Sequence, residues 1–291
     1  METSEWDVLV LDLDGTLLCK QGEVSDQNLH ALDEVREFGI EVVVATGRSF
    51  SECAHIVERI EHCGVCITAG GSQLTDCKGK TLAREVVPHT VVKTVSNKVV
   101  EGGHRALLLK DETACGVQYV LVGDAPLHQA STWWFDTLGI TLKEVPEFLE
   151  DPWPEHTLRV GAVAQENSLV PIAHALEASL EGIAKIQHWS AVTCSEATGS
   201  STHLLEVFGY SVNKWSMLKQ HVGSRLNKSR IVAIGDGLND IEVLQESGLS
   251  IVMENANESV LSHADVRAGH HDNHGFASAM QRWILPRGAN Q

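Results

Sequence analysis

An apolar run near the start of the chain ends in two aspartates, and this combination limits what the first segment can be. Val8 to Leu11 predict a buried strand, and Asp12 and Asp14 follow it before a turn at Gly15. Side chains two residues apart lie on the same side of an extended chain, so the two carboxylates repel each other. A cation between them would remove this repulsion, whereas two solvated acids at a fraying strand end would tolerate it. These residues alone leave both interpretations open.

The segments that follow alternate between strand and helix patterns. A helical periodicity with Ser25 as N-cap precedes one apolar run, and a second helix with a capping box of Ser49 and Glu52 precedes another. Because strands separated by helices pair in parallel with right-handed crossovers, we expect an α/β fold with a Rossmann-like parallel sheet. The expected elements are strands at 5–13, 40–46, 65–71, 229–236 and 249–254 and helices at 25–39, 49–64, 239–248, 257–264 and 274–284.

The middle of the chain has a different pattern, because neighbouring strands occur there without a helix between them. This pattern is typical of an antiparallel sheet, so we expect an inserted α+β domain. The expected domains are an α/β core of residues 1–85 and 205–291 and an insertion of residues 86–204. Within the insertion the sequence predicts helices at 91–103, 127–139 and 168–182 and strands at 105–110, 117–123, 157–165 and 183–194.

Composition and charge restrict the classes of function. The 291 residues are 43% hydrophobic and 21% charged, ordinary values for a globular protein, and the net charge of −17 argues against nucleic acid as the main partner. No apolar run is long enough for a bilayer span, and the acidic first residues do not resemble a signal peptide. Seven cysteines at irregular spacing fit reduced thiols. We therefore expect a cytoplasmic protein with neither a membrane nor a nucleic-acid partner, while its oligomeric state stays open.

Polar, glycine-containing segments follow three of the expected parallel strands. They are DLDGT at 12–16, TGR at 46–48 and GDGLND at 235–240. Since ligands bind at the carboxyl ends of the strands in an open parallel sheet, these segments should form one pocket with up to four carboxylates. A divalent cation with oxygen ligands would relieve the repulsion, and Mg²⁺ suits a few carboxylates together with a substrate phosphate.

Four motifs together resemble the haloacid dehalogenase superfamily of phosphohydrolases. They are DLDGT, ATGR at 45–48, the single Lys214 in SVNKWSML, and GDGLND, in the order and spacing of the family. In element order, the insertion resembles the α/β (type IIB) cap of the Cof-type branch. That branch is similar in layout to sucrose-phosphate and mannosyl-3-phosphoglycerate phosphatases and to the eukaryotic-type phosphomannomutases.

The resemblance implies a role for each matching residue. Asp12 matches the nucleophile that forms an aspartyl-phosphate, and Asp14 matches the general acid and base. Thr46 and Lys214 match the catalytic groups that hold and neutralise the phosphoryl group. The other implied positions are Gly15, Gly47, Arg48 and Asn239 for substrate or phosphate, and Asp12, Asp14 through its backbone carbonyl, Asp236 and Asp240 for Mg²⁺.

Some positions depart from the family pattern or lie outside it. Trp215 follows Lys214 where relatives usually have glycine, and AGGS at 69–72 replaces an Asn-Gly pair, which leaves a substrate contact from that strand open. Asn255, in a loop that matches in part, is a candidate for supporting the site. The segment GHHDNHG at 269–275 is either a solvated loop or a transition-metal site.

The expected function is a Mg²⁺-dependent phosphatase that hydrolyses a small phosphate ester, either a sugar phosphate or a phosphoglycerate-linked sugar. The cap would close over the core and select the leaving group. Two alternatives stay open: a phosphomutase of similar layout, and a catalytically silent binding protein, since a fold alone never proves activity. The sequence names neither the metabolite nor the cap residues that set specificity.

Overall fold

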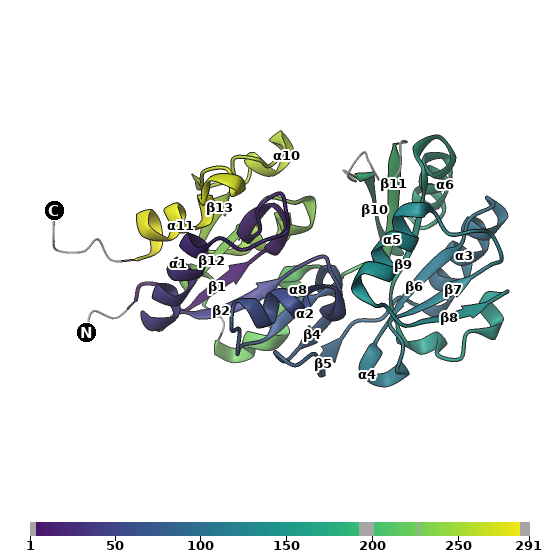
Figure 1. Ribbon diagram of the computed structural model, residues 1–291, viewed down its shortest axis with the longest axis horizontal. Coiled ribbons are helices and arrows are strands. Elements are labelled where there is room, and N and C mark those ends of the chain that lie inside the picture. Colours follow the sequence, from purple (N-terminus) through teal and green to yellow (C-terminus); the bar gives the residue numbers. More distant parts are fainter. Residues whose placement is uncertain (1–3, 192–200, 226, 286–291) are drawn as a thin grey trace. The chain divides into compact units, whose positions relative to one another are not determined.

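The computed structural model describes residues 4–191, 201–225 and 227–285, and the chain divides into two compact units (Figure 1). The first unit combines residues 1–82 with residues 213–291, and the second consists of residues 83–212. Each unit is described by itself below. Over the part of the chain that the structure describes, no helix is long and apolar enough to cross a membrane.

The first unit contains a sheet with the strand order β14-β13-β12-β1-β2-β3-β4-β5. The neighbours from β14 to β3 pair in parallel, and β3 pairs with β4 in the antiparallel sense. The strands are β1 (Val8–Leu11), β2 (Glu41–Ala45), β3 (Cys66–Thr68), β4 (Gln73–Thr75), β5 (Thr81–Arg84), β12 (Ile231–Gly235), β13 (Leu249–Val252) and β14 (Val266–Arg267). The predicted α/β fold with a parallel core sheet is confirmed.

Two helices of this unit begin at the caps that the sequence predicts. The Ser25 hydroxyl accepts a hydrogen bond from the Asn28 amide at 3.2 Å, and the Ser49 amide donates to the Glu52 carboxylate at 2.7 Å. The apolar faces of these helices pack with the buried strands in one core. The helices are α1 (Asp26–Glu37), α2 (Phe50–Arg59), α8 (Lys214–Val222), α9 (Ile241–Glu246), α10 (Glu258–Leu261) and α11 (Gly275–Ala279).

The second unit contains a mixed sheet with the strand order β10-β11-β9-β6-β7-β8. Its neighbours are antiparallel except for β7 and β8, which are parallel. The strands are β6 (Ala106–Lys110), β7 (Tyr119–Val122), β8 (Leu142–Val145), β9 (Thr157–Gln165), β10 (Ala184–Ala191) and β11 (Thr202–Gly209). The helices are α3 (His89–Glu101), α4 (Glu112–Cys115), α5 (Gln129–Leu138) and α6 (Glu166–Ser179).

The predicted elements do not include the short strands β4, β5, β8 and β14, the short helix α4 or the longer strand β11. The boundary expected at residue 204 falls inside β11, which pairs with β9 and β10 along its length, so residues 205–209 belong to the second sheet rather than to the core. The strand expected at 183–194 is β10 as far as Ala191, and its residues 192–194 lie outside the described residues. That the first unit is a catalytic core and the second an inserted cap domain stays a prediction.

A buried ion pair lies inside the second unit. The side chains of Lys110 and Asp151 have no exposed surface, and the Lys110 ammonium group donates to the Asp151 carboxylate at 2.5 Å. The same ammonium group donates to the Thr157 hydroxyl at 2.7 Å and to the Trp153 carbonyl at 3.1 Å. Burial lowers the pKa of Lys110, and the Asp151 carboxylate opposes this effect. The pair is therefore satisfied only while both partners are present.

We expect Lys110→Met to lower the free energy of unfolding of this unit by about 3–5 kcal/mol, because the Asp151 carboxylate would stay buried without its cation. Native-state hydrogen exchange at the β9 amides measures this loss. The control is Glu144→Gln, which removes the pair between Arg105 and the exposed Glu144 and should cost less than about 1 kcal/mol. Equal losses in the two variants would contradict the assigned importance of the buried pair.

Candidate active site

Three buried or partly buried aspartates meet at the carboxyl ends of the central parallel strands of the first unit. Asp12 follows β1, and β1 lies between β2 and β12 (Figure 1). Asp236 and Asp240 follow β12. One carboxylate oxygen from each of the three lies within 4.8 Å of the others, so together they could hold a metal ion. The neighbouring strand ends thus bring residues more than 220 positions apart in sequence into one cluster.

Lys214 is fully buried and shares its charge between two of these aspartates. Its ammonium group donates to Asp12 Oδ1 at 2.7 Å and to Asp240 Oδ1 at 2.6 Å. Lys214 is the first residue of α8, and Asn213 caps that helix by accepting from the Ser216 amide at 2.7 Å. The cap fixes where the helix begins and so directs the lysine into the cluster. Three carboxylates and one ammonium group leave a net charge of −2 when all are ionised.

This excess of negative charge shifts the pKa values of the groups in the cluster. Burial is the largest of the causes that raise the pKa of Asp12 well above its ordinary value, and the charge of the Asp240 carboxylate is the next. Lys214 opposes this shift. Burial and Asp240 also raise the pKa of Asp236 to about 6. Burial by itself would lower the pKa of Lys214, but the carboxylates of Asp12 and Asp240 raise it above the usual value. One ammonium group therefore does not balance the cluster.

The turn after β12 orients its own aspartate. Asp240 Oδ2 accepts hydrogen bonds from the backbone amides of Gly237 at 2.9 Å and Asp236 at 3.2 Å. With Lys214 on the other oxygen, both oxygens of Asp240 have partners within the protein. Asp240 is thus held in one orientation, which makes it a supporting group for the cluster as well as a potential ligand.

The turn after β1 contacts Asp236 directly. Gly15 has a backbone φ of 72°, and a Cβ atom there would collide with the Asp236 carboxylate, so only glycine fits this position. The Thr16 hydroxyl donates to Asp236 Oδ1 at 3.2 Å. The amide group of Asn255 donates to Asp236 Oδ2 at 3.0 Å and to the Gly15 carbonyl at 2.8 Å. Gly15, Thr16 and Asn255 therefore position Asp236.

Asn255 and Thr16 have contacts that the sequence analysis did not assign. The motif alone marks Thr16 only as part of DLDGT, and the loop around Asn255 matches the family pattern in part. Asn255 Oδ1 accepts from the backbone amide of His271, whose ring lies 2.7 Å from the Leu18 carbonyl. The histidine-containing segment at 269–275 thus packs against the loops of the site.

Asp14 has a different environment from Asp12. Its carboxylate is half exposed and lies outside the cluster of three, and both of its oxygens accept hydrogen bonds from Arg48, at 2.8 Å from Nε and 2.5 Å from Nη2. Arg48 also donates to the Glu52 carbonyl at 3.3 Å, which anchors it to α2. The structure thus pairs Arg48, the predicted substrate contact, with Asp14.

The loop after β2 lies beside the turn that carries Asn239. Thr46 has no exposed surface, and its hydroxyl accepts from the Arg48 amide at 3.2 Å. A Cβ atom at Gly47 would lie only 3.1 Å from Asn239 Nδ2, which places these two predicted residues in contact. The Gly70 amide donates to the Thr46 carbonyl at 3.0 Å, so AGGS supports this loop through its backbone.

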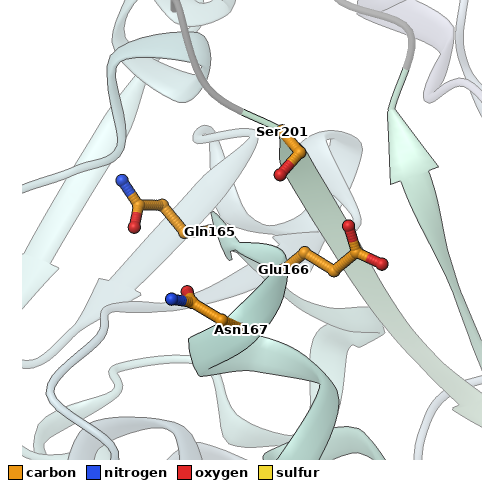
Figure 2. Close-up of a pocket in the computed structure, with 4 residues that line it drawn as sticks. All are labelled: Gln165, Glu166, Asn167 and Ser201. Atoms are coloured by element: carbon orange, nitrogen blue, oxygen red, sulfur yellow. The ribbon is translucent and has the colours of Figure 1, made fainter.

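An open cavity of about 320 Å³ lies at the junction of β9 and α6 in the second unit (Figure 2). Gln165, Glu166, Asn167 and Ser201 line it. The Gln165 and Asn167 side chains extend to one side of the helix start and that of Glu166 to the other (Figure 2). A single carboxylate among neutral polar groups supplies no catalytic constellation, and no predicted site residue lies here.

A family model described as haloacid dehalogenase-like hydrolase matches residues 9–280. The chain belongs to this family. The chain is 26% identical over 282 residues to 5-amino-6-(5-phospho-D-ribitylamino)uracil phosphatase YcsE of Bacillus subtilis, with 96% of each protein covered. The family and the enzyme class that the sequence predicts, a haloacid dehalogenase-like hydrolase, are thereby confirmed.

Solved structures show the same architecture. A haloacid dehalogenase-like hydrolase from Bacteroides thetaiotaomicron matches with a TM-score of 0.75 and 25% identity, over 95% of this chain and 99% of its own. The structure described as the subclass IIB sugar phosphatase BT4131 matches with a TM-score of 0.73 and 18% identity, over 94% of this chain and 97% of its own. The second likeness, at 18% identity, is one of fold.

We expect Asn255→Ala to raise the apparent pKa of Asp236 further in the metal-free protein, because a hydrogen bond to the ionised carboxylate is lost. Carboxyl-carbon NMR across a pH titration measures the change. The matched control is Asn257→Ala, which removes the N-cap of α10 without touching an aspartate of the cluster. An unchanged titration in Asn255→Ala, or an equal shift in the control, would show that Asn255 does not position Asp236.

Proposed function

We propose that this chain is a Mg²⁺-dependent phosphatase that hydrolyses small phosphate monoesters through an aspartyl-phosphate on Asp12. The observation that carries the proposal is the buried cluster of Asp12, Asp236 and Asp240 with Lys214, whose formal charge of −2, with all four groups ionised, matches one divalent cation. A solvated acidic patch would not need a fully buried lysine. The two units would then be a catalytic core and a cap, as the sequence predicts.

The donor set fits Mg²⁺. The cluster offers carboxylate oxygens only, and hard cations such as Mg²⁺ prefer oxygen ligands over nitrogen and sulfur. Asp12 and Asp236 would hold the ion, with Asp240 as a ligand or as the group that orients them, and the Asp14 backbone carbonyl stays a predicted ligand. When bound, the ion neutralises charge on the carboxylates and on the phosphoryl group.

In the proposed reaction, Asp12 and Asp14 have different roles. Lys214 holds Asp12 Oδ1, which leaves Asp12 Oδ2 as the oxygen that attacks phosphorus. As the bond between phosphorus and the leaving oxygen breaks, Asp14 supplies the proton that this oxygen takes up. For this step the Asp14 carboxyl group must leave Arg48 and carry a proton, and its half-exposed position gives it room to move.

The second half of the reaction restores the enzyme. Asp14, now a carboxylate, takes a proton from a water molecule whose oxygen attacks phosphorus, and the bond between phosphorus and Asp12 breaks. Inorganic phosphate leaves with Asp12 free and Asp14 protonated. Thr46 and the amide of Gly47 would hold phosphoryl oxygens during both steps, and Asn239, in contact with Gly47, would position this loop.

The proposed substrate is a phosphorylated sugar or polyol, or a phosphoglycerate-linked sugar. Support comes from the name of the Bacillus subtilis relative, which acts on a compound with its phosphate on a ribityl chain. Such substrates have an alkoxide leaving group, which needs a proton from a general acid. Arg48, once released from Asp14, would be available to contact the substrate.

The direct test is phosphate release from a panel of phosphorylated metabolites in the presence of Mg²⁺. We expect release of inorganic phosphate that chelation abolishes and added Mg²⁺ restores, because the cluster carries uncompensated charge without a cation. Full activity after exhaustive chelation would disprove the role of the metal. Transfer of the phosphoryl group within the substrate without release of phosphate would identify a mutase instead.

Two substitutions distinguish the roles of the first two aspartates. Asp12→Asn should reduce turnover about 10⁴-fold or more for every substrate, because the attacking charge is lost. Asp14→Asn should reduce turnover of a sugar phosphate far more than that of an aryl phosphate, whose leaving group needs no proton. With the aryl phosphate, a phosphoenzyme should accumulate, and burst kinetics would detect it.

The outcomes for these variants are distinct. Retained turnover in Asp12→Asn would rule out the covalent mechanism. Equal losses for sugar and aryl phosphates in Asp14→Asn, with no trapped intermediate, would rule out the general-acid role of Asp14. Arg48→Lys is an informative companion, since it keeps the charge but removes the two-pronged contact with Asp14.

A further inference from the structure

Two histidines and a glutamate meet in the second unit where α6 packs beside β10 and β11 (Figure 1). His174 and Glu177 lie three residues apart on α6 and so share one side of that helix. His188 comes from β10. One potential ligand atom of each residue lies within 4.8 Å of the others, and His188 Nε2 is 3.5 Å from Glu177 Oε1.

A third histidine, His203, fixes the orientation of the His188 ring. His203, on β11, is 4% exposed, and its Nε2 lies 2.9 Å from Nδ1 of His188. The hydrogen bond occupies one ring nitrogen of His188 and directs the other nitrogen toward Glu177. Nδ1 of His203 is buried and has no hydrogen-bond partner among the described residues. A histidine that ligates a metal through one ring nitrogen commonly donates the N–H of the other to a hydrogen-bond acceptor, which fixes its tautomer and orientation. His203 Nε2 would be this acceptor for His188.

We propose that His174, Glu177 and His188 form a transition-metal site of the zinc class that joins α6 to β10, with His203 as the residue that positions His188. Two imidazoles and one carboxylate are a common donor set for Zn²⁺. Tetrahedral ligands at about 2.0–2.1 Å from the ion are about 3.4 Å apart, close to the spacing of His188 and Glu177.

The charge and exposure of the cluster also suit a transition metal. The site has one carboxylate and two imidazoles, so a divalent cation leaves a charge of +1 that solvent can screen. His174 and Glu177 are exposed, and small side-chain rotations would bring all three ligand atoms to one ion. The aspartate cluster of the first unit offers only oxygen ligands, so the two sites should select different metals.

Metal binding would have a structural consequence. The ligands come from a helix and from a neighbouring strand, so an ion that binds only the folded unit would hold these elements together and stabilise the unit. Without a metal, these residues are joined by an edge-on contact between the rings of His174 and His188 and by a weak pair between His188 and Glu177. The metal-bound and metal-free protein should therefore differ in thermal stability, which can be measured without a catalytic assay.

The experiment is a calorimetric titration of the full chain with Zn²⁺ in the presence of excess Mg²⁺. In a parallel titration with Co²⁺, the absorbance of the bound ion reports on nitrogen ligands. We expect about one zinc ion at this site, an affinity at least tenfold lower in His174→Asn and in His188→Asn, and a higher thermal unfolding temperature only when Zn²⁺ can bind. The matched control is His30→Asn, since His30 faces Glu34 across one helical turn at 3.7 Å without a third ligand.

A second comparison tests the positioning residue. His203→Gln keeps a hydrogen-bond acceptor for His188, whereas His203→Leu does not, so zinc affinity should fall more in the leucine variant, by about 10–100-fold. Circular dichroism verifies that both variants are folded, and if the leucine variant is not, the His174→Asn comparison decides. Unchanged zinc affinity in His174→Asn and His188→Asn would overturn the proposal. So would a loss of binding that follows only His270→Asn or His271→Asn in the other histidine cluster.

Discussion

The Lys214 ammonium group that Asp12 and Asp240 share is the interaction on which the rest of the site depends. It connects the end of β1, the start of α8 and the turn after β12, which are distant in sequence. Lys214 is fully buried, so water does not screen its charge, and removing it would leave two buried carboxylates unpaired. It is nevertheless a single positive charge against three acids. A divalent cation is the simplest means to complete the balance.

The environments of Asp12 and Asp14 differ although only one residue separates them. Asp12 is buried beside Lys214, which fixes one of its oxygens and suits a group that must attack from a defined position. Asp14 is half exposed and paired with Arg48, which suits a group that must move and exchange protons. Gly15 lies directly against the Asp236 carboxylate, whereas the Asp14 carboxylate, one residue earlier, lies outside the cluster. The proposed zinc-class site has a different donor chemistry, so the two units would select different metals.

The strongest local signals predict the fold of the first unit. The apolar runs of β1, β2, β12 and β13 and the caps at Ser25 and Ser49 are local properties, and the structure has these elements at those places. The strands that were missed are mostly short or at a sheet edge, and two to four residues carry too little periodicity to predict a strand. β11 was missed because its pairing with β9 and β10, rather than its own residues, places it in the second sheet.

By itself, the sequence determined which chemical groups are present and that several carboxylates follow parallel strands, since strand pattern and turn chemistry are encoded locally. Tertiary structure alone decided which groups touch. It paired Arg48 with Asp14, gave Lys214 two aspartates, and brought Asn255 to Asp236. It also placed the histidine of β10 beside α6. The physical reason is that acidity, charge balance and metal-ligand geometry depend on distances of a few ångströms between residues far apart in the chain, and no local pattern specifies those distances.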